Sequence, residues 1–240
     1  MSFSSGFRNR MKAYGHSDSD SIKNSTFHIA NSLFEEAPNF TYVKINNEEI
    51  GVRVLDGKDT YERYLLLRPE SALDVGTILT YKEELWLVFN TIGEMFSPKS
   101  RVQLCNDTLK WEAKDGSVFE IPTAVSSSKS TKYDIASNEL QVLMLQGGVY
   151  AYVQSNELTR QIMHSQRFIL GSNVYEISGI DDLTYVDKNN NGIIQFTLRV
   201  TTKRSEDDFI KNIADNSFLY ANSVEDKDED KEEEGGGTLW

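Results

Sequence analysis

The sequence predicts a mainly β protein with an N-terminal helix, one or two small β-barrel or sandwich modules, and extended termini. Two observations predict this class. Apolar and polar residues alternate in short segments, as at 85–88 and 102–104, and turn-forming residues separate these segments. The chain has 240 residues, of which 39% are hydrophobic, so it can bury one large core or two small ones.

Residues 1–38 are predicted to form an N-terminal helical arm. Residues 17–20 read Ser-Asp-Ser-Asp, which offers several side-chain oxygens for capping a helix start. Apolar residues then follow at helical spacing until Pro38, which ends the helix. A shorter helix is expected at 7–14, with Gly15 as its end.

Residues 39–125 are predicted to form a β-barrel-like module. The turn pairs Asn46-Asn47 and Asp115-Gly116 predict hairpins because these residue types tolerate positive φ. Pro69, Pro98 and Pro122 are expected in loops. The predicted strands are 40–45, 49–55, 61–67, 76–81, 85–90, 101–105, 108–113 and 118–121.

A second β module is predicted at 132–216, after a polar linker at 126–131. Its apolar pattern at 167–177 echoes that at 77–88, which indicates a tandem of similar barrels. A short helix is expected at 206–213, and 217–240 should form an acidic flexible tail. The predicted strands are 132–136, 140–145, 149–154, 166–170, 174–180 and 192–200.

Charge and cysteine usage exclude several classes of protein. The net charge of -12 argues against nucleic-acid binding, which depends mainly on clustered Lys and Arg. One cysteine excludes an intramolecular disulfide, and neither a secretory signal nor an apolar run of about 20 residues is present. We therefore expect a protein of the reducing cytosol without membrane contact.

The stretch 187–192 has two interpretations. Asp187, Asn189 and Asn191 occupy positions 1, 3 and 5 of a calcium loop of the EF-hand type, with Gly192 at position 6. Position 12 is Leu198, where that loop needs a bidentate Glu, and the flanking residues alternate like strands. A hairpin turn is therefore the preferred interpretation, and no metal site is predicted.

No catalytic or cofactor-binding set is predicted. Cys105 has no neighbouring His, so a packed, reduced thiol is expected. The three histidines are far apart in the sequence, and paired acids such as Asp181-Asp182 fall in predicted turns where solvent keeps both ionised. Aromatic residues near predicted turns, including Tyr64, fit core packing and a protein interface equally well.

One run of the sequence carries a resemblance to a known family. Leu67-Arg68-Pro69, Asp74-Val75-Gly76 and Ile213-Ala214-Asp215 accompany a signature made of Trp86, Cys105, Asn106, Leu109, Lys110 and Trp111. With these segments in this order, residues 1–216 resemble head-tail connector proteins of tailed phages of Gram-positive bacteria. These proteins are also called head-closure, stopper or neck proteins. The resemblance implies a non-enzymatic subunit of a homo-oligomeric ring, of six or twelve copies, in the virion neck. Such a ring joins the portal to the tail or other neck proteins and helps to retain packaged DNA.

Two terminal segments are candidate functional regions. The apolar and basic residues near the start are expected to dock on a neighbouring subunit or the portal: Phe3, Phe7, Arg8, Arg10 and Lys12. The acidic run carries a net charge of -6 and could line a channel through which DNA passes without sequence-specific binding; its acids are Glu225, Asp226, Asp228, Glu229, Asp230, Glu232, Glu233 and Glu234. Two alternatives remain open: a tail-completion, adaptor or minor capsid protein, and a glycan-binding or hydrolytic β protein of the tail tip.

Overall fold

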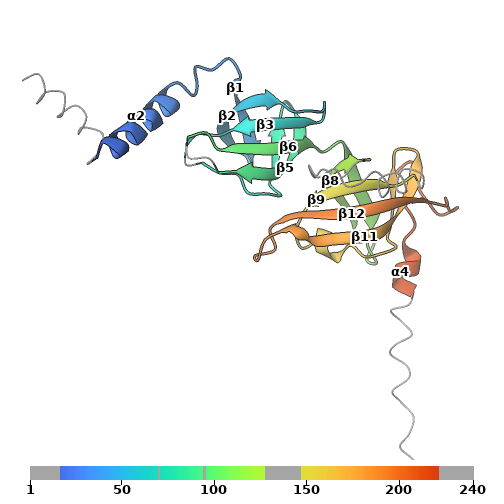
Figure 1. Cartoon of the computed structure of the whole chain (residues 1–240). Helices are drawn as coiled ribbons and strands as arrows, with labels where there is room; N and C mark the ends of the chain where they lie inside the picture. The colour runs from blue at the N-terminus through green and yellow to red at the C-terminus, as the bar shows by residue number, and fades with distance from the viewer. Residues whose placement is uncertain (1–16, 70, 94–95, 128–146, 222–240) are drawn as a thin grey trace, which may run out of the picture.

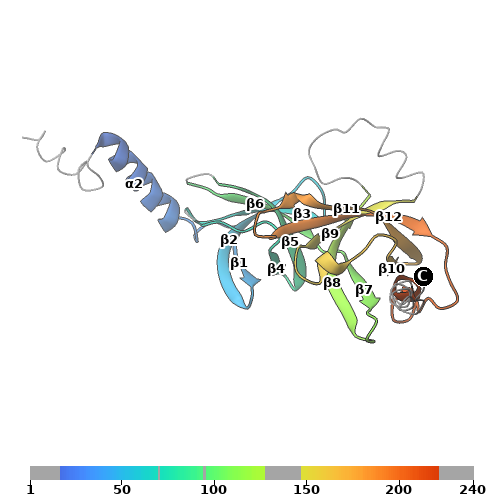
Figure 2. The ribbon, with the colours of Figure 1, turned by 90° about the horizontal axis from the view of Figure 1, so that it is seen from below.

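A computed structural model describes residues 17–69, 71–93, 96–127 and 147–221 of the chain (Figure 1). The helix α2 (Asp18–Ser32) precedes all of the strands. As predicted, it begins after Ser17, whose hydroxyl accepts a hydrogen bond from the N–H of Asp20. In Figures 1 and 2, α2 lies at the end of the molecule away from the second half of the chain. None of the helices among the described residues has the length and apolar character needed to cross a membrane.

The first six strands form a closed antiparallel barrel, here called barrel 1, in the order β1-β2-β3-β6-β5-β4. The Asn46-Asn47 turn joins β1 to β2 as predicted, with φ angles of 49° and 70°. Leu65, Leu79, Trp86, Val88 and Val102 are among the side chains that fill the interior. The strands are β1 (Phe40–Ile45), β2 (Glu48–Asp56), β3 (Glu62–Leu66), β4 (Ile78–Tyr81), β5 (Glu84–Ile92) and β6 (Lys99–Leu104).

The other six strands form a nearly closed barrel, here called barrel 2, in the order β7-β8-β9-β12-β11-β10. Its end strands β7 and β10 lie beside each other. Trp111, Phe168, Ile177 and Phe196 are among its buried core residues. The strands are β7 (Asp107–Glu112), β8 (Val118–Ser126), β9 (Val149–Gln154), β10 (Arg167–Leu170), β11 (Asn173–Val186) and β12 (Gly192–Thr201).

The two barrels repeat one topology. Adding six to each strand number of barrel 1 gives the strand order of barrel 2. The hairpins β4–β5 and β10–β11 are therefore equivalent, and they contain the two stretches whose apolar patterns echo each other in the sequence. The predicted tandem of similar barrels is confirmed at the level of topology.

The observed division of the chain differs from the predicted one. The expected first module, 39–125, includes β7 and most of β8, but both strands belong to the sheet of barrel 2. The chain passes from one barrel to the other at Cys105 and Asn106, and β8 extends to Ser126. The polar stretch expected to link the modules at 126–131 therefore follows a strand of the second barrel. Residues 128–146, with two predicted strands, lie outside the described part.

Three smaller expectations were wrong. Pro122 lies within β8 rather than in a loop, at a position where β8 has not yet begun to pair with β9, so its missing N–H is tolerated. Residues 206–213 form turns closed by a bridge between Asp208 and Ile213 instead of a helix. The short helix α4 (Ser217–Ala221) occupies the start of the expected flexible tail.

Candidate functional site: the cleft between the barrels

The two barrels meet through an apolar cluster that both of them contribute. Leu87 and Phe89 of β5 pack with Tyr152 of β9 and Ile193 of β12. A bulge in β5 between Val88 and Asn90 interrupts the strand alternation, and the Phe89 ring lies edge-on to Tyr152 at 5.0 Å between centroids. Side chains from both barrels therefore share one buried cluster.

The backbones of the two barrels also approach each other closely at Gly76. A Cβ atom at this position would lie 2.0 Å from the carbonyl oxygen of Gly192, which begins β12. Gly76 also has a φ of 86°, a conformation that favours glycine. Glycine at this position is therefore required both by its own conformation and by the contact with barrel 2.

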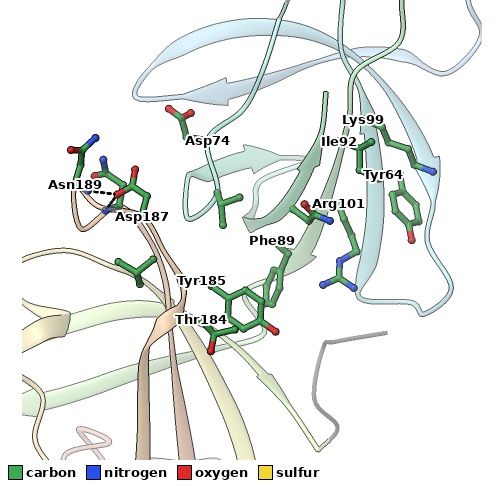
Figure 3. Close-up of a pocket in the computed structure, with 14 residues that line it drawn as sticks. Tyr64, Asp74, Phe89, Ile92, Lys99, Arg101, Thr184, Tyr185, Asp187 and Asn189 are labelled. Carbon is green, nitrogen blue, oxygen red and sulfur yellow. Dashed lines mark hydrogen bonds between the residues drawn. The ribbon is translucent and has the colours of Figure 1, made fainter. Parts of the chain in front are cut away.

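A cleft of about 920 Å³ opens beside this contact and takes its walls from both barrels (Figure 3). The β3, β5 and β6 strands supply most of one wall, and the end of β11 with the turn after it supplies the other. Ligand sites often occur where two domains meet, so this cleft is the main candidate site. Its lining residues are Tyr64, Asp74, Val75, Phe89, Asn90, Ile92, Lys99, Arg101, Thr184, Tyr185, Val186, Asp187, Asn189 and Asn191.

The barrel 1 wall combines cationic and aromatic side chains. Lys99 Nζ lies 3.8 Å from the centre of the Tyr64 ring, and the Arg101 guanidinium lies 5.3 Å from the centre of the Phe89 ring. Arg101 also lies 3.8 Å from Glu62, its ion-pair partner. Burial and a hydrogen bond to Glu62 raise the pKa of the Tyr64 hydroxyl, so this phenol stays protonated at neutral pH. The cationic and aromatic side chains of this wall are therefore pre-ordered by their own contacts.

The barrel 2 wall is built on the turn that joins β11 to β12. Asp187 Oδ1 accepts hydrogen bonds from the N–H groups of Asn189 and Asn191, at 2.8 and 2.9 Å. Val186 pairs with Gly192 across the turn, which confirms the hairpin interpretation of this stretch. The Asp187 carboxylate therefore orders the turn.

This arrangement suits recognition of a polar partner. Lys99 and Arg101 lie on the barrel 1 side of the cleft, and Asp187 and Asn189 lie on the barrel 2 side, as Figure 3 shows. Arg101 is already paired with Glu62, and Asp187 is engaged with backbone N–H groups. Such pre-ordered groups favour binding and orientation of a partner.

The signature residues nearest the crossing between barrels have structural roles. Trp86 lies in the barrel 1 core and is 3% exposed. Cys105 packs against the cluster between the barrels, and burial raises the pKa of its thiol to about 12. The Asn106 side chain donates to the Val125 carbonyl at 3.0 Å and accepts from the Val125 N–H at 2.7 Å. This pair of hydrogen bonds fixes the start of β7 against the end of β8.

The remaining signature residues belong to barrel 2. Leu109 and Trp111 are in its core, where the Trp111 ring lies 6.0 Å from Phe168 in an edge-on arrangement. Lys110 lies on the outer surface, 3.6 Å from Glu120. The structure therefore brings the signature together at the barrel junction and along β7. The predicted terminal candidates, Phe3 to Lys12 and Glu225 to Glu234, lie outside the described residues.

Sequence reasoning singled out only part of the cleft. Tyr64 was noted as an aromatic residue near a predicted turn, and Asp187, Asn189 and Asn191 as a turn. Phe89 and Arg101 were not singled out as site residues, because each falls inside a predicted strand. The bulge that brings Phe89 to the junction has no clear sequence signal.

The comparisons with known proteins concern barrel 2. Residues 107–199 match the family model of the YomX C-terminal domain. This is a phage-related protein domain. The matched range begins at the first residue of β7 and ends within β12, so the YomX C-terminal domain model covers barrel 2 and none of barrel 1. The searches of curated proteins and of solved structures returned no match.

Proposed function

We propose that this chain is a non-enzymatic structural subunit of a phage neck ring, which joins the portal to the tail and helps to retain packaged DNA. The match of barrel 2 to the YomX C-terminal domain supports a phage-related role for this half of the chain. The resemblance of the sequence to head-tail connectors supports the neck position. The virion is accordingly the proposed location.

The observation that carries the assembly part of this proposal is the two-sided apolar character of α2. On one side, Phe27 contacts Phe96 of its own chain at 6.5 Å between ring centroids, and Phe34, just after the helix, contacts Phe40 at 5.9 Å. On the other side, Ile22 and Ile29 are 61% and 55% exposed. Phe27 is about 140° around the helix from Ile22, so its contact leaves the second face uncovered.

Three exposed apolar residues, here called the stripe, lie along the uncovered face of α2. Ile22, Ile29 and Leu33 follow one another at spacings of seven and four residues, which places them on the same side of the helix. A helix that is apolar on two sides is usually covered on both. We therefore assign the stripe to contacts with a neighbouring subunit or the portal, with the cleft between the barrels as a second contact surface.

The test replaces Ile22 and Ile29 together by Ser. Burying each isoleucine contributes about 1.5–3 kcal/mol, so assembly should weaken at least about 100-fold. Native mass spectrometry of the purified chain, alone and with its portal, measures the assembly. In infected cells, unjoined heads and tails should accumulate. Thermal unfolding of the isolated subunit should stay nearly unchanged because both residues are exposed.

The matched control replaces Lys23 and His28, which are exposed on the same helix outside the stripe. This control should assemble normally. If the Ile22/Ile29 variant forms rings and yields virions as the control does, the assembly role of α2 is wrong. Labelling of virions with an antibody to barrel 2 distinguishes the neck from the alternatives, a tail-completion, adaptor or minor capsid position.

One observation favours a candidate of another class, glycan binding at the tail tip. The cleft holds Tyr64 and Tyr185 together with the carboxylates Asp74 and Asp187. Aromatic rings and carboxylates in one groove are suited to sugar rings and their hydroxyl groups. Binding of host cell-wall oligosaccharides that is lost in a Tyr185→Ala variant would favour this role over the neck.

A further inference from the structure

Two surfaces of the chain are complementary in shape: the stripe on α2 and the cleft between the barrels. The three residues of the stripe are all more than half exposed, and they project from a helix. The cleft is concave, and Val75, Ile92 and Val186 are among the apolar residues that line it. Ile92 is 49% exposed. Docking of the apolar face of a helix in an apolar groove is a common mode of recognition between protein chains.

The stripe faces away from its own chain. Phe27, on the other side of α2, contacts Phe96 in the connection between β5 and β6. Ile22 lies about 140° around the helix from Phe27, so the stripe points away from barrel 1. In Figures 1 and 2, α2 also projects beyond the two barrels. Covering the stripe therefore requires a second molecule.

A contact between the stripe and the cleft would join two different surfaces of identical chains. In an open row of copies, such a heterologous contact leaves one stripe and one cleft unused, and all of them are used only when the row closes into a ring. A contact between two stripes, in contrast, would stop at a dimer. Pairing of the stripe with the cleft is therefore the arrangement that suits a ring.

Charge complementarity gives the direction of the helix in the cleft. In Figure 3, Asp74 and Asp187 lie on one side of the cleft, and Lys99 and Arg101 lie on the other. The start of a helix carries a partial positive charge, and its end carries a partial negative charge. The last turn of α2 has no basic residue, and the exposed Glu36 follows the helix. The start of a docked α2 therefore lies toward the two aspartates and its end toward Lys99.

We propose that the stripe of each subunit docks in the cleft between the barrels of the neighbouring subunit. This inference rests on the proposed ring and names the two surfaces that form it. Ile29, in the middle of the stripe, packs among the apolar residues of the cleft, and Ile22 and Leu33 pack on either side of it. Glu36 lies beside Lys99 of the neighbouring subunit.

Two full-length variants with one new cysteine each test this contact. Thr26→Cys places a thiol about 40° around the helix from Ile22 and leaves the stripe intact, and Asn189→Cys places a thiol in the cleft wall. Native Cys105 does not interfere, because burial raises the pKa of its thiol to about 12. The two variants are mixed, assembled and treated with a short bifunctional maleimide, and linked dimers are measured on denaturing gels. The mixture should give about tenfold or more linked dimers than either variant alone, because a heterologous contact does not bring two identical cysteines together.

Exchange of charges tests the direction of the helix. Lys99→Glu in the Asn189→Cys variant should reduce linking about two- to fivefold, because it replaces an attraction to Glu36 by a repulsion. Glu36→Lys in the Thr26→Cys variant should restore linking, since the two charges are then opposite again.

The matched control is His28→Cys, whose thiol is exposed on the same helix outside the stripe. Mixed with Asn189→Cys, it should give no more linked dimers than either variant alone. The proposal is overturned if rings form but Thr26→Cys links to Asn189→Cys no better than His28→Cys does, or if Thr26→Cys links to itself as well as to Asn189→Cys. Absence of rings from the unmodified protein would instead show that the proposed ring itself is wrong.

Discussion

At the residue scale, the most buried ion pair among the described residues joins Arg167 to Asp207. Both side chains are buried, and two hydrogen bonds of 2.9 Å join the guanidinium to the carboxylate. Arg167 also donates to the carbonyls of Thr202 and Asp215, at 2.8 and 3.1 Å. These contacts hold the segment after β12 against β10. No sequence pattern predicted this pair, because its members are 40 residues apart and match no local motif.

Breaking this pair should be costly. Asp207→Asn leaves the buried Arg167 charge uncompensated, so we expect a loss of about 3–5 kcal/mol in the free energy of unfolding at pH 7. Urea denaturation followed by circular dichroism measures it. Lys110→Gln, which removes an ion pair with Glu120 on the surface, is the control and should cost less than about 1 kcal/mol. Equal losses in the two variants would contradict this role for the buried pair.

The same carboxylate should make barrel 2 sensitive to acid. Burial alone would raise the pKa of Asp207, but the N–H groups of Arg204 and Asp215 and the Arg167 guanidinium outweigh it and lower the pKa. A carboxyl with a lowered pKa contributes its stability above its ordinary value near 4 and loses it as the pH falls through the folded-state value. Asp207→Asn should therefore flatten the loss of stability below pH 4. If the free energy of unfolding of Asp207→Asn falls below pH 4 as steeply as that of the unchanged protein, other groups cause the loss of stability in acid.

At the scale of elements, alternation predicted the strands well and turn chemistry predicted their ends. The strands β1 and β9 have the predicted bounds, and most others differ by one to three residues. The expected helix at 206–213 failed because Asp208 Oδ1 accepts from the N–H groups of Ile210 and Lys211, while Asn212 takes a φ of 56°. Local side-chain hydrogen bonds of this kind compete with a helix. The register of the β11–β12 hairpin depends on another such turn.

The β11–β12 hairpin predicts that a substitution at Gly192 destabilises the protein. The φ of Gly192 is 138°, and a Cβ atom there would lie 2.0 Å from the Tyr185 carbonyl oxygen. Gly192→Ala should therefore destabilise the protein by about 2 kcal/mol or more beyond Gly171→Ala, whose position also has positive φ but no atom within 4 Å of the added Cβ. Thermal and urea unfolding measure the difference. Calcium should leave the thermal and urea unfolding transitions of the protein unchanged. A large increase in stability on addition of calcium would restore the EF-hand interpretation.

At the scale of the whole molecule, the sequence indicated two barrels but misplaced the boundary between them. The polar stretch at 126–131 has the composition of a linker, yet it follows β8 within barrel 2. The true crossing at Cys105 and Asn106 has no such composition, because the barrels are in contact and the short connection packs between them. The cleft could not be predicted for the same reason, since it exists only where the two barrels meet.

The contact between barrels can be tested through the thiol of Cys105. Burial raises its pKa to about 12, so at pH 8 only about one thiol in ten thousand is the reactive thiolate. Gly76→Ala should push the barrels apart, because its Cβ would lie 2.0 Å from the Gly192 carbonyl oxygen. Exposure of Cys105 to water would then lower its pKa, and alkylation should become about tenfold faster or more.

The matched control for this experiment is Gly116→Ala. Gly116 has a φ of 83°, close to the 86° of Gly76, but the nearest atom to its added Cβ is 3.9 Å away and belongs to barrel 2 itself. The two variants therefore share the backbone strain and differ in the approach between barrels. Mass spectrometry after timed iodoacetamide labelling gives the rates. Equal rates in the two variants would show that Gly76 does not hold the barrels together, whereas faster labelling of Gly76→Ala alone would establish the rigid tandem on which the cleft depends.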